Sequence, residues 1–78
     1  MRLTLYTMPG CHLCEEMKAR LSGLKTRQPF GLTEIDISTS PTLQRLYQHH
    51  IPVLLLDGEE IARHRIDEAE LLALLDGR

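Results

Sequence analysis

The sequence lacks long apolar runs and long blocks of one charge. Its longest apolar stretches are Val53 to Leu56 and Leu71 to Leu75, which are far too short to span a membrane. The net charge is only −2, and acidic and basic residues are interspersed, so we expect neither nucleic-acid nor membrane binding. The first residues alternate polar with apolar and lack the apolar region and cleavage site of a signal peptide. We therefore expect a cytoplasmic protein.

The sequence also has few residues and few cysteines. Its 78 residues, 42% of them apolar, allow one domain over residues 1–78, with a thin core and a frayed end at Gly77-Arg78. The only two cysteines are Cys11 and Cys14. A bridge between them would close a very small loop and remove little unfolded-state entropy. In a reducing compartment such a pair indicates catalysis, redox sensing or metal binding.

Apolar periodicity predicts elements in the order β-α-β-α-β-β-α. The expected strands are Arg2 to Thr7, Leu32 to Ile37, Pro52 to Leu56, and Glu59 to Arg63 or His64. The expected helices begin at Cys11, at the cap signal Ser40-Pro41 and at Asp67. Strands joined by a helix should be parallel, and Asp57-Gly58 should close an antiparallel hairpin. We therefore predict an α/β fold with a mixed four-stranded sheet and helices on both faces.

Three finer expectations accompany this order. The third strand is almost continuously apolar, so it should lie in the middle of the sheet. Gly23 should end or fray the first helix. Leu43, Leu46 and Tyr47 should form the buried side of the short second helix.

The segment Cys11-His12-Leu13-Cys14 follows Pro9-Gly10 at the start of a helix. Unpaired N–H groups and the positive end of the helix dipole there stabilise a thiolate, which is the reactive form of cysteine. We therefore expect Cys11 to attack a substrate disulfide and Cys14 to resolve the mixed disulfide. A cationic His12 would help, but neighbouring side chains on a helix diverge, so an ordinary exposed histidine is the simpler interpretation.

The chain resembles glutaredoxins and the wider thioredoxin fold, and most closely the short glutaredoxin-like proteins. The resemblance rests on Leu5-Tyr6-Thr7, the segment from Pro9 to Cys14, Ile51-Pro52-Val53, Asp57-Gly58 and the final leucine-rich helix. It implies a thioredoxin-like fold and a disulfide oxidoreductase. Cys11 would be the nucleophile, Cys14 the resolving thiol and Pro52 a cis-proline that leaves the backbone of Ile51 free to pair with substrate. Glutathione would be a co-substrate that contacts Ile51 and Asp67.

The sequence departs from the glutaredoxin pattern around the motif. His12 and Leu13 replace the usual proline and aromatic residue, and Met8 replaces a lysine that helps to bind glutathione. The usual Gly-Gly pair is missing from residues 61–67. Arg63 or Arg65 could replace the lysine charge, although solvated arginines are the simpler interpretation. Glutathione recognition therefore stays open.

Two other functions compete with the oxidoreductase. In the first, Cys11, Cys14 and His12, with His49-His50, handle a metal or share an iron–sulfur cluster. A structural zinc site needs four ligands, however, and we expect no bound metal and no permanent cofactor. In the second, the fold serves as a binding adaptor for extended peptides. We favour a monomeric oxidoreductase whose partners are protein disulfides or glutathione.

Overall fold

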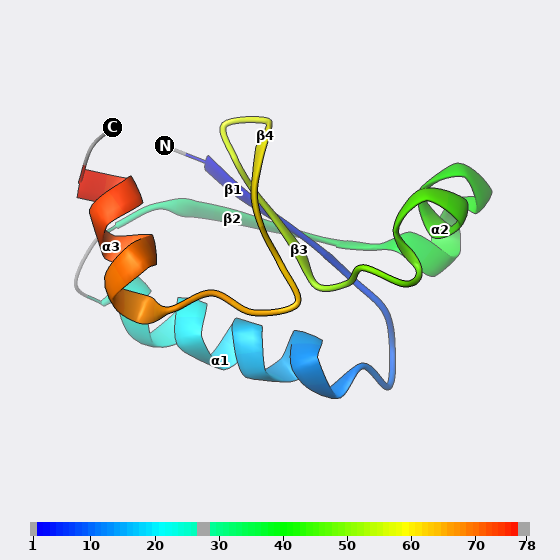
Figure 1. The fold of residues 1–78 in the computed structure, drawn as a ribbon, viewed down its shortest axis with the longest axis horizontal. Coiled ribbons are helices and arrows are strands. Elements are labelled where there is room, and N and C mark those ends of the chain that lie inside the picture. Colours follow the sequence, from blue (N-terminus) through cyan, green and yellow to red (C-terminus); the bar gives the residue numbers. More distant parts are fainter. Residues whose placement is uncertain (1, 27–28, 77–78) are drawn as a thin grey trace.

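The computed structural model describes residues 2–26 and 29–76, so Met1, residues 27–28 and the expected frayed end at Gly77-Arg78 lie outside it. The strands are β1 (Arg2–Thr7), β2 (Gly31–Asp36), β3 (Val53–Leu56) and β4 (Glu59–Arg63). The helices are α1 (His12–Lys25), α2 (Pro41–Tyr47) and α3 (Glu68–Asp76), with a 3-10 turn, η1, at Ile37–Thr39. This is the predicted order (Figure 1).

The sheet is mixed, with strand order β2-β1-β3-β4. β1 runs parallel to β2, with Leu5 opposite Glu34, and antiparallel to β3, with Leu5 opposite Leu54. The apolar strand β3 therefore lies inside the sheet, as predicted, and Val53, Leu54 and Leu56 are fully buried.

The main core lies between the sheet and the helices α1 and α3. Alternation along β1 turns Leu3 and Leu5 toward this core. They pack in one cluster with apolar residues of β3 and of both helices, namely Leu54, Leu56, Met17, Leu21, Leu24, Leu71 and Leu75. Tyr6 has the opposite orientation, and its ring lies 4.9 Å from that of Tyr47 in α2. Helices therefore cover both faces of the sheet, as predicted.

The hairpin between β3 and β4 shows why a particular dipeptide stands at its turn. Asp57 and Gly58 both have positive φ angles, 50° and 87°. Two such residues match the twist of the flanking strands, and Asn-Gly or Asp-Gly pairs tolerate this conformation best. The predicted tight hairpin is confirmed.

Two local expectations were wrong, and a third was wrong in part. Helix α1 does not end at Gly23 but continues to Lys25, because one glycine in the last turn weakens a helix without ending it. The second strand ends at Asp36, and Ile37 instead begins η1, where it is buried. Leu46 is 57% exposed, because α2 is too short to press a whole apolar face on the sheet.

None of the helices in residues 2–26 and 29–76 combines the length and apolar character needed to cross a bilayer.

Candidate functional site

Cys11 stands at the junction between β1 and α1. The strand ends at Thr7, and the chain reverses through a turn in which Gly10 has a φ of 77°. Cys11 itself is extended, with φ −87° and ψ 109°, and is the N-cap of α1. Its Sγ accepts a hydrogen bond from the backbone N–H of Cys14 at 3.1 Å. The sulfur thus takes the capping place that serine or aspartate oxygens usually fill.

The two cysteines form a disulfide, with Cα atoms 5.2 Å apart. Cys14 is fully buried, whereas Cys11 is partly exposed. An incoming group from solvent can therefore reach Cys11 and not Cys14. Once Cys11 is linked to such a group, Cys14 is the sulfur positioned to displace it.

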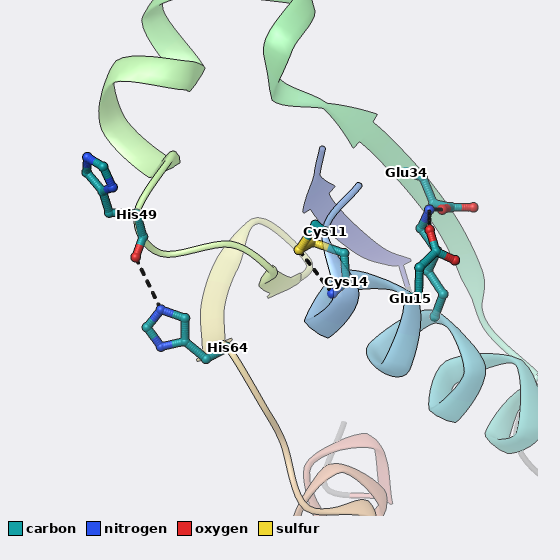
Figure 2. Close-up of a disulfide and its surroundings, with 7 residues drawn as sticks. Cys11, Cys14, Glu15, Glu34, His49 and His64 are labelled. Atoms are coloured by element: carbon teal, nitrogen blue, oxygen red, sulfur yellow. Dashed lines mark hydrogen bonds and ion pairs between the residues drawn. A yellow bond between two sulfur atoms is a disulfide. The ribbon is translucent and has the colours of Figure 1, made fainter. Parts of the chain in front are cut away.

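Pro52 lies just before β3, at the same end of the sheet where β1 ends and the turn to Cys11 begins. Val53 pairs with Tyr6, so the residue before Val53 reaches the end of β1. The Ile51-Pro52 bond is cis, as the resemblance predicted. In Figure 2 the chain after His49 turns toward the disulfide.

The backbone of Ile51 is less available than expected. Its N–H donates to the carbonyl oxygen of Tyr47 at 3.1 Å, because the turn after α2 continues the helical hydrogen bonding. The expectation of a free backbone is therefore wrong for this donor. The carbonyl of Ile51 accepts no hydrogen bond within residues 2–26 and 29–76.

The histidines do not gather around the cysteines as metal ligands. His12 is 89% exposed, and its Nε2 lies 3.7 Å from Glu16 Oε1, which favours the simpler interpretation of this residue. The His49 carbonyl lies 3.3 Å from Nε2 of His64, and the ring of His50 lies 6.4 Å from that of His64. Across the described ranges, no three His, Cys, Asp or Glu residues are arranged to hold a metal.

His64 connects the end of β4 to the cis-proline segment. It has a positive φ of 65°, and its N–H donates to the carbonyl of Pro52 at 2.8 Å. Asp67, expected to contact glutathione, is exposed and precedes α3, where its carbonyl accepts from Leu71 N–H at 2.9 Å.

Two clefts adjoin the cysteine motif. The first, of about 120 Å³, lies between α1 and residues 64–66, and we call it the basic cleft. Its apolar wall comes from Leu13, Met17 and Ile66, and its charged groups are Glu16, Arg20 and Arg65, with His64 beside them. The helical face was predictable from its spacing. Its closure by residues 64–66 was missed, because that contact depends on tertiary packing.

The second cleft, of about 320 Å³, lies on the side of Met8 and Pro9, and we call it the acidic cleft. Its charged residues are Glu15, Lys18, Glu34 and Asp36. Lys18 Nζ lies 3.3 Å from carboxylate oxygens of both Glu34 and Glu15, and hydrogen bonds to these two residues raise the pKa of Lys18. Its single positive charge is thus already shared between two carboxylates (Figure 2 shows Glu15 and Glu34).

The chain is similar to a family of glutaredoxin-like proteins and to individual proteins of known sequence or structure. The model of the Glutaredoxin-like domain (DUF836) family matches residues 2–76. The chain is 37% identical to protein Ne2328 from Nitrosomonas europaea, with a TM-score of 0.81 over 95% of this chain and 89% of that one. It is 32% identical to a Dictyostelium discoideum protein described as a glutaredoxin-like YDR286C homolog, over 88% of this chain and 69% of that protein.

More distant structures share only the fold. Mitochondrial thioredoxin 3 from Saccharomyces cerevisiae is 19% identical and superposes with a TM-score of 0.69 over 99% of this chain and 77% of that one. The predicted thioredoxin-like architecture is thus confirmed. With a family match that spans nearly all of its residues, the chain belongs to the glutaredoxin-like domain family (DUF836).

Proposed function

We propose that the protein is a thiol–disulfide oxidoreductase that reduces protein disulfides or glutathione mixed disulfides. The observation that carries this proposal is the asymmetry of the cysteine pair. Cys11 caps a helix and is partly exposed, while Cys14 is buried and within bonding reach of it. Helix N-termini stabilise thiolates, and an exposed thiolate is the form that attacks disulfides.

The reaction transfers two electrons to the substrate. The Cys11 thiolate attacks one substrate sulfur, the substrate S–S bond breaks, and the departing sulfur leaves as a thiolate that takes up a proton. Cys14 then loses its proton and attacks Cys11 Sγ, and the second substrate sulfur leaves as a thiol. The protein ends with the Cys11–Cys14 disulfide, the form present in this structure. Two further thiols, from glutathione or a dithiol protein, would reduce it again.

The reactivity of Cys11 and substrate turnover test the proposal together. After reduction, the rate of Cys11 alkylation against pH should give an apparent pKa below the roughly 8.5 of free cysteine. Wild type should also turn over a glutathione mixed disulfide or a protein disulfide when a reductant is supplied. If neither substrate turns over and Cys11 reacts no faster than free cysteine in the folded protein, the proposal fails.

The Cys11→Ser variant separates this function from the adaptor. An oxidoreductase loses all activity with this substitution, whereas an adaptor keeps its biological function, because serine preserves the surface and can still cap the helix. Complementation of a strain that lacks the protein, by wild type and by this variant, distinguishes the two. Full complementation by Cys11→Ser would favour the adaptor.

A further inference from the structure

The two clefts beside the cysteine motif carry opposite charge. The acidic cleft has the carboxylates of Glu15, Glu34 and Asp36 against the single ammonium of Lys18. The basic cleft has two guanidinium groups against one carboxylate. In Figure 2, Glu15 and Glu34 of the acidic cleft lie on one side of the disulfide, and His64, which lines the basic cleft, lies on the other. A substrate bound across Cys11 therefore meets a different charge on each flank.

The two arginines of the basic cleft, Arg20 and Arg65, are available to bind an anion. Neither Arg20 nor Arg65 forms an ion pair within residues 2–26 and 29–76. Arg63, by contrast, is engaged, because its Nε lies 2.5 Å from Glu60 Oε2 and a terminal nitrogen lies 3.2 Å from Oε1. Of the two arginines that could replace the missing lysine, Arg65 lines the basic cleft and Arg63 does not.

The acidic residue of the basic cleft lies near a histidine of the cysteine motif. Glu16 Oε1 is 3.7 Å from His12 Nε2. Arg20 lies one turn further along α1, and Arg65 approaches from the segment before α3. A carboxylate that enters between the two arginines can therefore accept hydrogen bonds from their guanidinium groups, the donors best suited to it.

The basic cleft begins beside the cysteine motif. Leu13, which lines it, stands between the two cysteines in sequence. From Cys11 to Arg20 the helix rises roughly 14 Å, at about 1.5 Å per residue. An extended peptide covers that distance in about four residues. A side chain within about four residues of a substrate cysteine bound at Cys11 therefore reaches the arginines.

We propose that the basic cleft binds the carboxylate of an aspartate or glutamate that lies within about four residues of the disulfide cysteine in a substrate protein. Arg20 and Arg65 are then the specificity-determining residues. The acidic cleft fixes the direction of the substrate, because it repels the same carboxylate on the other flank. This inference rests on the proposed function.

The place at which a substrate carboxylate binds differs from what the glutaredoxin resemblance implied. In glutaredoxins, a lysine at the position of Met8 helps to bind the carboxylate of glutathione. In this chain Met8 lines the acidic cleft, so an anion is disfavoured on that side and favoured on the other. The protein should therefore select substrates by an acidic peptide side chain that lies on the side of residues 64–66.

Paired peptide disulfides test the proposal. Two peptides differ only by Glu or Gln two residues from the disulfide cysteine, and kcat/KM is measured for each. We take the ratio of kcat/KM for the acidic peptide to kcat/KM for the neutral peptide. This ratio should be about two- to fivefold higher in wild type than in Arg20→Gln or in Arg65→Gln, the range for exposed ion pairs. Glu16→Gln should raise the ratio. Salt at 1 M should reduce the wild-type ratio toward that of the arginine variants.

Lys25→Gln is the matched control, because it removes the same charge from the far end of α1. Its ratio should equal that of wild type. The ratio cancels the thiolate fraction of Cys11 in each variant, and its comparison between variants cancels the difference in intrinsic reactivity of the two peptides.

Three results would overturn the inference. The first is an equal ratio in wild type and both arginine variants, and the second is an equal fall in Lys25→Gln. The third is slower turnover of a glutathione mixed disulfide in the arginine variants with no change in the peptide ratio, since the cleft would then bind glutathione. If wild type reduces neither the peptide disulfides nor a glutathione mixed disulfide, the proposed function has failed separately. Whenever no peptide is reduced, equilibrium binding of the same peptides with serine for cysteine decides the inference, by whether Arg65→Gln weakens binding of the acidic peptide alone.

Discussion

The backbone N–H of Cys14 donates to the sulfur of Cys11 across 3.1 Å. One residue thus supplies both the hydrogen bond that holds the outer sulfur at the helix start and the inner sulfur of the disulfide. C-x-x-C spacing at a helix N-terminus allows this arrangement, because an N-cap side chain can accept from the N–H three residues on.

The two cysteines should give different defects when each is replaced by serine. Cys11→Ser should reduce disulfide turnover to the buffer background, because the attacking thiolate is gone. Cys14→Ser should keep fast attack, since its backbone N–H still faces Cys11, but should accumulate a mixed disulfide. Mass spectrometry of the reaction mixture checks this. Equal loss of the first step in both variants would contradict the assigned order.

Leu54 should be among the most sensitive core positions. It is fully buried in a central strand and belongs to the main core cluster. Leu54→Ala should lower the free energy of unfolding by about 2–5 kcal/mol, through lost transfer energy and the cavity left behind. Chemical denaturation measures this.

Leu46→Ala is the matched control for Leu54→Ala, because that side chain is 57% exposed. Its effect should stay within about 0.5 kcal/mol. A large loss in this variant would mean that Leu46 packs in a way the structure does not have.

Two glycines should respond to alanine with opposite signs. A Cβ at either Gly58 or Gly23 meets nothing within 4 Å, but Gly58 has a φ of 87°. Gly58→Ala should therefore destabilise the protein by about 1–2 kcal/mol, through left-handed backbone strain. Gly23→Ala, inside α1, should stabilise it by about 0.5–1 kcal/mol. Thermal unfolding of both variants checks the pair, and the same sign for both would refute the argument.

Asp36 should contribute to the acid sensitivity of the fold. Hydrogen bonds from the hydroxyl and the backbone N–H of Ser38 lower the pKa of its carboxyl. A carboxyl with a lowered folded-state pKa adds stability above its unfolded-state pKa, and this stability is lost as pH falls through the folded-state pKa. In Asp36→Asn, the loss of stability on acidification below about pH 4 should therefore be smaller than in wild type.

Ser38→Ala tests the same linkage from the donor side. It removes the hydroxyl but keeps the backbone donor, so the pH dependence should fall between those of wild type and Asp36→Asn. Urea unfolding from pH 7 to pH 3 provides the comparison. Three identical pH profiles would show that the contact does not contribute.

Much of the fold was readable from local signals. Alternation in Arg2 to Thr7, the cap Ser40-Pro41 and the Asp57-Gly58 turn each predicted an element that the structure contains. These signals work because helix and strand periods, caps and positive φ angles are settled by residues close in sequence. The motif at the start of α1 was readable for the same reason.

Sequence alone thus determined the order of elements, the helix-capping cysteine and its buried partner. Tertiary structure decided the exposure of Leu46, the engaged N–H of Ile51 and the different surroundings of Arg63 and Arg65. It also decided the charge of the two clefts. Each of these depends on which distant segments pack together, and that is fixed by the burial of a shared core and not by any local preference.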